Sequence, residues 1–124
     1  ADKMAALGIN ILSLADTVGL ATAPQIFSVT EYLIKHLPTH EIGVHLHSTQ
    51  ITWKEKLDAA VRAGCKRFDG ALKGIGGCPM AEDELVGNMD TELMIDYFKQ
   101  RKMLKPLNEE ALVHSLQLAS QIFV

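Results

Sequence analysis

Residues 43–50 read GVHLHSTQ and set two histidines, His45 and His47, two positions apart in a strand-like run. Because side chains alternate between the two faces of a β-strand, both imidazoles are expected on one face, with Val44 and Leu46 on the other. Imidazole is a frequent ligand of divalent metals, so the pair suits two adjacent positions of one coordination sphere. The same pattern also suits an exposed or hydrogen-bonded histidine pair, and the rest of the chain has to decide between these interpretations.

The segments on either side of this strand alternate between strand-like and helix-like patterns. Strands are expected over 9–16, 41–47 and 65–72, and helices over 22–38, 52–64, 91–103 and 108–123. The apolar face expected for the first helix consists of Ile26, Val29, Leu33 and Ile34. Strands that alternate with helices across short connections predict right-handed β-α-β units and a parallel sheet, which is the α/β class.

Polar residues gather where the expected strands end. One or two lie at the end of each strand and two more in the following loop; they are Asp16, His45, His47, Asp69, Cys78 and Asn88. In α/β folds with parallel strands, ligands bind at the carboxyl ends of the strands. The sequence therefore predicts a functional site at that edge of the sheet.

The glycine-rich stretch GIGGCP, residues 74–79, matches neither a P-loop nor a dinucleotide-binding turn. It is typical of a mobile or tightly turned loop, here one that carries Cys78. A cysteine in an exposed loop suits a nucleophile or an acid-base group, whereas Cys65, expected inside a strand, suits packing. No nucleophile elbow or Ser-His-Asp spacing supports a hydrolase. Surface or packing positions are expected for His36, His40 and His114.

The composition bounds the class of protein. The chain has 124 residues, of which 48% are hydrophobic, and this suits one folded domain. A net charge of −3 gives no reason to expect nucleic acid or an anionic membrane as a partner. Neither a membrane span nor a signal peptide is expected, and the two cysteines form no disulfide framework. We therefore expect a soluble protein in the cytoplasm.

Four stretches carry a family resemblance, namely LSLADTVGLAT (12–22), VHLHST (44–49), FDGALKGIGGCPMA (68–81) and GNMDTE (87–92). They resemble the hydroxymethylglutaryl-CoA lyase family of metal-dependent lyases and aldolases, which is built on a (β/α)8 TIM barrel. The resemblance implies that residues 1–124 form one partial barrel domain, corresponding to its fifth to eighth strands and C-terminal helices. GGCP followed by GN favours the lyase branch, because the related homocitrate and isopropylmalate synthases lack that cysteine loop.

The resemblance also implies a reaction and a set of site residues. His45 and His47 would ligate Mg²⁺ or Mn²⁺, and Asn88 would add an oxygen ligand. Cys78 would act in proton transfer, and Asp16 would help to arrange the active site. The activity implied is a carbon-carbon lyase acting on an acyl-CoA substrate, the retro-Claisen cleavage of 3-hydroxy-3-methylglutaryl-CoA to acetoacetate and acetyl-CoA.

The chain departs from the family pattern in two ways. The first half of the barrel is absent, and with it the arginine-aspartate pair that the family places on its first strand. Half a barrel is expected to expose an apolar sheet edge and to associate with the missing N-terminal half or with a second copy, so a homo-oligomer is expected. Locally, Ser48 replaces an acidic residue of the family, and Met80 stands where an aromatic residue is common.

These departures leave three interpretations open. The chain is a fragment of a hydroxymethylglutaryl-CoA lyase, inactive or very weak alone because it lacks a ligand and a charge-stabilising arginine. Alternatively, it belongs to a related lyase or aldolase that acts on another hydroxyacyl-CoA or on a hydroxy-keto acid. The third interpretation is a non-catalytic half-barrel whose function is association.

Overall fold

The computed structural model describes residues 1–77 and 86–123, which form a three-stranded parallel sheet with helices. The strands are β1 (Ile11–Asp16), β2 (Glu41–Leu46) and β3 (Arg67–Asp69), in the order β1-β2-β3. The helices are α1 (Asp2–Ala6), α2 (Ala23–His36), α3 (Trp53–Arg62), the short 3-10 helix η1 (Leu72–Gly74), α4 (Thr91–Gln100) and α5 (Glu109–Ile122). The α/β class and the parallel sheet predicted from the sequence are confirmed. None of the helices described here is long and apolar enough to cross a lipid bilayer.

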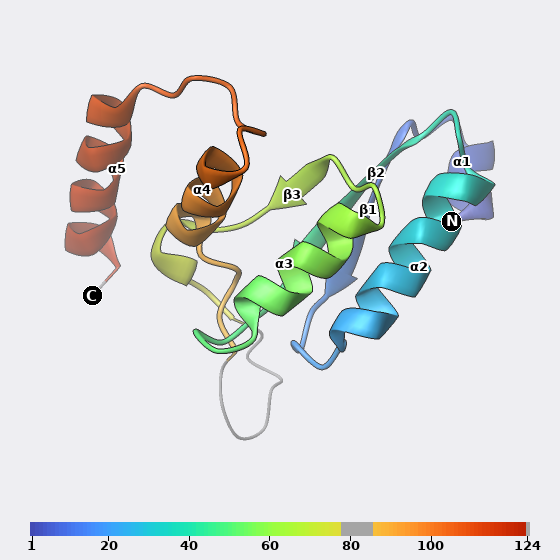
Figure 1. The fold of residues 1–124 in the computed structure, drawn as a ribbon, viewed down its shortest axis with the longest axis horizontal. Coiled ribbons are helices and arrows are strands. Elements are labelled where there is room, and N and C mark those ends of the chain that lie inside the picture. The colour runs from blue at the N-terminus through green and yellow to red at the C-terminus, as the bar shows by residue number, and fades with distance from the viewer. Residues whose placement is uncertain (78–85, 124) are drawn as a thin grey trace.

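The helices are distributed unevenly around the sheet (Figure 1). α2 and α3 lie side by side over β1 and β2, whereas α4 and α5 contact η1 beyond β3. β3 is much shorter than the strand expected over 65–72, since it ends at Asp69; Ala71 then pairs with Asp90 in an isolated bridge, and the chain turns into η1.

α2 begins where its sequence provides a capping box. The Thr22 hydroxyl accepts a hydrogen bond from the Gln25 backbone N–H at 3.4 Å, and the Gln25 side chain accepts one from the Thr22 N–H at 2.9 Å. Of the apolar face predicted for this helix, Ile26 is buried, but the prediction for Val29 is wrong because its side chain is 48% exposed. Leu33 is buried as predicted, and Thr30 takes the third buried position, because residues 26, 30 and 33 follow the three- and four-residue spacing of one helix face.

The core lies between the helices α2 and α3 and the sheet. Val44 and Leu46 of β2 point into it, as the alternation in GVHLHSTQ predicted, and they pack with Leu57 and Ala60 of α3. All four side chains are at most 4% exposed. Burial of apolar surface at about 25 cal/mol per Å² makes this cluster the main stabilising contribution of the fold.

The opposite face of the sheet is polar. The Ser13 hydroxyl donates to Asp69 Oδ2 at 3.0 Å across Gly43, and Arg67 lies over the same glycine. A Cβ atom at Gly43 would come within 2.9 Å of Arg67 Cδ. Among the large apolar side chains of the three described strands, that of Ile11 alone is exposed, at 46%. The large apolar side chains of the described strands therefore expose little surface.

A cluster of three polar side chains, Asp58, Tyr97 and Arg101, connects α3 to α4. The Tyr97 hydroxyl donates to Asp58 Oδ1 at 2.8 Å, and the Arg101 guanidinium lies 3.6 Å from the centre of the Tyr97 ring. Desolvation by burial, followed by the Asp58 carboxylate, raises the pKa of Tyr97 to about 12. The hydrogen bond from Tyr97 is the largest cause that holds the pKa of Asp58 below its ordinary value of 3.8.

Replacing Tyr97 with phenylalanine should lower the free energy of unfolding at pH 7 by about 1 kcal/mol, the usual net value of one hydrogen bond. The effect should depend on pH. Because the folded-state pKa of Asp58 is lowered, its carboxylate stabilises the fold above the unfolded-state value of 3.8, and this stability is lost as the pH falls through the lowered value. Urea denaturation at pH 7 and in acid should therefore show a shallower acid loss for Tyr97→Phe than for the parent chain. Tyr32→Phe, at a position 60% exposed, is the control, and equal acid losses in all three proteins would contradict the prediction.

Candidate metal centre

The parallel register brings the carboxyl ends of the three strands to one edge of the sheet. Asp16 pairs with Leu46 and His45 pairs with Asp69, so residues from all three strands lie at neighbouring positions. The expectation that these strand-end residues share one edge is confirmed for the residues described. Cys78 and Met80 lie outside the described residues.

His45 and His47 lie side by side at the end of β2. Their ring centroids are 5.3 Å apart and the ring planes make an angle of 67°. The His47 side chain belongs to a residue only 5% exposed, whereas His45 is half-buried. Two imidazoles at this separation on one face are compatible with binding to a common cation.

One hydrogen bond fixes the orientation of the His47 ring. Nδ1 lies 3.0 Å from the carbonyl oxygen of Val86. Because a carbonyl oxygen can only accept, the neutral ring must carry its proton on Nδ1, and the lone pair is then on Nε2. A backbone carbonyl that accepts from one ring nitrogen is the usual support of a metal-bound histidine.

Asn88 lies opposite His47, to which it is paired in an isolated antiparallel bridge. Its Nδ2 donates to the Ile75 carbonyl at 2.8 Å, which directs the amide. Gly76 allows this approach, because a Cβ atom there would lie 2.9 Å from Asn88 Nδ2, and its φ of +91° also favours glycine. Asn88 Oδ1 is buried and has no hydrogen-bond partner in the described part of the chain.

These groups fit a divalent cation. A buried amide oxygen without a hydrogen bond costs free energy, and a cation beside it would supply the missing interaction. Two imidazoles and an amide oxygen suit a hard or borderline ion such as Mg²⁺ or Mn²⁺. Within residues 1–77 and 86–123, no group of three or more His, Cys, Asp or Glu side chains is placed to hold a metal. The described residues therefore offer a partial ligand set.

Asp16 is directed into the protein. Its Oδ2 accepts from the Lys56 ammonium at 2.8 Å, and its Oδ1 accepts from the Ala21 N–H at 3.1 Å. The side chains of Asp16 and Lys56 are 8% and 5% exposed. The prediction that Asp16 helps to arrange the active site thus has a concrete candidate partner in Lys56, which the sequence analysis missed. The available signal was a lysine next to Leu57, on the apolar side of a helix.

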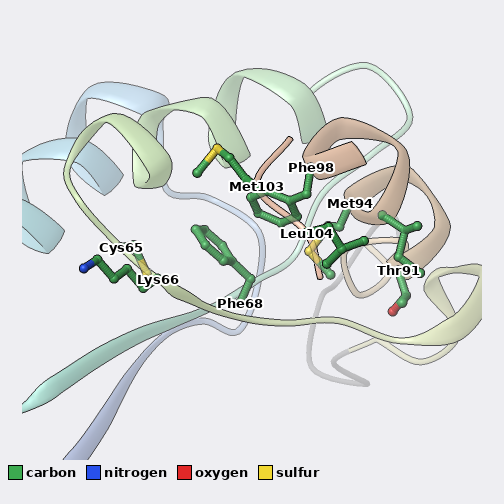
Figure 2. Close-up of a pocket in the computed structure, with 9 residues that line it drawn as sticks. Cys65, Lys66, Phe68, Thr91, Met94, Phe98, Met103 and Leu104 are labelled. Atoms are coloured by element: carbon green, nitrogen blue, oxygen red, sulfur yellow. The ribbon is translucent and has the colours of Figure 1, made fainter. Parts of the chain in front are cut away.

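A cavity of about 600 Å³ lies elsewhere, between β3 and α4 (Figure 2). Its lining is mostly apolar, and the rings of Phe68 and Phe98 meet in it with centroids 4.9 Å apart. Cys65 borders it, is 4% exposed and donates to the Arg67 carbonyl at 3.1 Å. Burial raises the pKa of this thiol, so it stays protonated, and the packing role predicted for Cys65 is confirmed. Because no candidate site residue lines this cavity, we place the site at the strand ends.

Comparison with known proteins shows what this arrangement is similar to. The family model described as HMGL-like matches residues 1–119. The chain is 38% identical over 93 residues to hydroxymethylglutaryl-CoA lyase YngG of Bacillus subtilis, and this match covers 75% of the chain and 31% of that relative. It is 36% identical over 92 residues to (R)-citramalyl-CoA lyase of Chloroflexus aurantiacus, covering 74% of the chain and 29% of the relative. The matched part of the chain thus covers less than a third of the length of these relatives.

Comparison with solved structures points to the same family. The crystal structure of the Bacillus subtilis HMG-CoA lyase superposes with a TM-score of 0.84 at 30% identity, over 97% of this chain and 40% of that one. The match confirms the predicted partial TIM barrel, of which the described residues supply three strands. Together, the family model, the relatives and the superposition show that the chain belongs to the HMGL-like family and covers part of the lyase fold.

Proposed function

We propose that this chain supplies one section of the active site of a divalent-metal-dependent carbon-carbon lyase, with His45, His47 and Asn88 as metal ligands. The observation that carries the proposal is the unit formed by His47 and Asn88, in which one imidazole is oriented by Val86 and one buried amide oxygen has no hydrogen bond in the described chain. The family and its lyase members support the reaction class.

Each site residue would have its own role in a retro-Claisen cleavage. When bound, Mg²⁺ or Mn²⁺ supplies Lewis acidity toward the substrate hydroxyl. His45, the Nε2 atom of His47 and Asn88 Oδ1 would hold the ion. In the cleavage, the hydroxyl passes its proton to a base such as water, its carbon becomes a ketone as the carbon-carbon bond breaks, and the electron pair of that bond moves to the α-carbon of acetyl-CoA. Cys78, which lies outside the described residues, is the group we propose to protonate that carbon.

The substrate is proposed as a 3-hydroxyacyl-CoA, with 3-hydroxy-3-methylglutaryl-CoA as the first candidate. The similar identities to relatives named for hydroxymethylglutaryl-CoA and for (R)-citramalyl-CoA favour a second candidate, another hydroxyacyl-CoA. Substitution of an acidic residue of the family by Ser48, beside the histidine pair, points the same way. Hydroxy-keto acids stay the third class to be assayed.

The rest of the barrel is proposed to come from a missing N-terminal half or from a second copy of the chain. β1 and β3 each pair on one side only within the described sheet, so both edges offer hydrogen-bonding groups to a further strand. Without that part we propose that the chain is inactive or very weak. The homo-oligomer and the cytoplasmic location expected from the sequence stay predictions.

A chimeric enzyme tests the proposed function. We would replace the matching section of the Bacillus subtilis HMG-CoA lyase with this chain and assay 3-hydroxy-3-methylglutaryl-CoA and (R)-citramalyl-CoA with Mg²⁺ and with Mn²⁺. The chimera should cleave at least one of the two substrates, because the other section of the barrel completes the ligand set. The chain alone should show no turnover above background.

The matched control is the same chimera with His47→Ala, which should lose turnover while its far-ultraviolet circular dichroism stays that of the parent chimera. A folded chimera that cleaves neither substrate would favour the non-catalytic association module. Turnover that survives His47→Ala would refute the assignment of the metal ligands.

A further inference from the structure

Lys56 occupies an unusual place for a lysine. It lies on α3 between the exposed Glu55 and the fully buried Leu57, and its own side chain is 5% exposed. A buried ammonium requires hydrogen-bond acceptors for all three of its N–H groups. The structure provides these acceptors from two separate segments that meet at the candidate metal centre.

The first two acceptors lie at the end of β1 and in the loop that follows it. Lys56 Nζ donates to Asp16 Oδ2 and to the Gly19 carbonyl, both at 2.8 Å. The third acceptor is the backbone carbonyl of His47, at 2.9 Å. The ammonium therefore connects the β1-α2 loop directly to the main chain of a proposed metal ligand.

The same loop also contacts the residue that orients the His47 ring. At Gly19, where φ is +71°, a Cβ atom would lie 2.8 Å from Val86 Cγ1, so this loop is closely packed on Val86. The carbonyl of Val86 accepts the hydrogen bond from His47 Nδ1. Lys56 thus holds the His47 backbone directly. It also holds the β1-α2 loop, which packs against Val86, the residue whose carbonyl orients the His47 ring.

We infer that Lys56 is a positioning residue of the metal centre, which holds His47 in the orientation that metal binding requires. The inference rests on the proposed function of His47. The competing explanation is that the Asp16–Lys56 pair contributes only to stability. Replacing a buried ion pair with apolar residues of similar size is often neutral or stabilising, so stability and positioning can be separated by removing both charges together.

The experiment compares the 124-residue chain with Lys56→Met and with the double variant Asp16→Leu/Lys56→Met. The double variant leaves no unpaired buried charge. Lys54→Met removes a lysine from an exposed position of the same helix, and Leu57→Ala weakens the core without touching the ammonium. Each protein is titrated with Mn²⁺ by calorimetry at a temperature at which circular dichroism shows it folded.

The dissociation constant of Mn²⁺ should rise at least about tenfold in both Lys56 variants, as for other residues that support a metal ligand. It should stay at the parent value in Lys54→Met and Leu57→Ala. A double variant that folds and binds Mn²⁺ like the parent chain would overturn the inference.

A second measurement needs no metal. The Ser48 N–H donates to the Gly87 carbonyl at 3.1 Å, next to the carbonyl that Lys56 holds. Its hydrogen exchange should accelerate at least about tenfold in the double variant relative to amides of α2, because the end of β2 is released. Unchanged exchange would overturn the inference. If the parent chain bound no Mn²⁺, the proposed metal centre would fail, and the exchange result would still decide whether Lys56 orders the His47 segment.

Discussion

Replacing His47 with alanine should raise the dissociation constant of Mn²⁺ by at least about 100-fold. Loss of a supporting group outside the ligand shell already costs about 10–100-fold in metal affinity, and loss of a ligand should cost more. The effect is expected to be large because His47 is 5% exposed and its ring is already oriented through Nδ1. Calorimetric titration of the 124-residue chain measures it.

His47→Leu should give the same loss while filling more of the space left by the ring. His114→Ala is the control, because His114 lies at an exposed position of α5. If both His47 variants bound Mn²⁺ with the affinity of the parent chain and kept its circular dichroism, the histidine pair would have only a packing role.

Replacing Asp16 with alanine should lower the free energy of unfolding by about 3–5 kcal/mol, the usual cost of removing one partner from a buried ion pair. The carboxylate is 8% exposed and is the charged acceptor of the Lys56 ammonium, which is itself 5% exposed. Without it, Lys56 keeps two carbonyl acceptors and an uncompensated buried charge. Urea denaturation at pH 7 measures the difference.

Asp96→Ala provides the matched control, because Asp96 is exposed on α4 and its side chain makes no hydrogen bond or ion pair with residues 1–77 and 86–123. Its free energy of unfolding should change by less than about 0.5 kcal/mol, as is usual for surface substitutions. If Asp16→Ala and Asp96→Ala were equally stable, the Asp16–Lys56 ion pair would contribute nothing to the stability of the fold. Asp16 would then be a simple strand-end carboxylate.

The two predictions address different properties of one edge of the sheet. His47 concerns the ligand itself, and Asp16 concerns the network that reaches the His47 carbonyl through Lys56. We expect the His47 variants to lose metal affinity without losing stability, and Asp16→Ala to lose stability. Together these results would distinguish metal binding by His47 from stabilisation of the fold by Asp16. The additivity of the two changes can be tested in a double variant, since sites that share a network rarely add.

Much of the fold could be predicted because its signals are local. The two-residue period of GVHLHSTQ placed Val44 and Leu46 in the core and His45 and His47 together on the other face. Helical spacing located α2 and α3 within two residues at each end. The face of α2 was partly wrong, since the sequence alone does not show that Thr30 rather than Val29 faces the core.

The sequence by itself determined the α/β alternation, the shared face of the histidine pair and the gathering of polar residues at the strand ends, because each follows from the periodicity of a short segment and from the rules for connecting parallel strands. Only the tertiary structure decided that Val86 orients His47, that Asn88 Oδ1 is buried without a hydrogen bond in the described chain, and that Lys56 joins Asp16 to the His47 carbonyl. These contacts join residues 9–40 positions apart, and their partners are set by how the packed segments meet rather than by any local pattern.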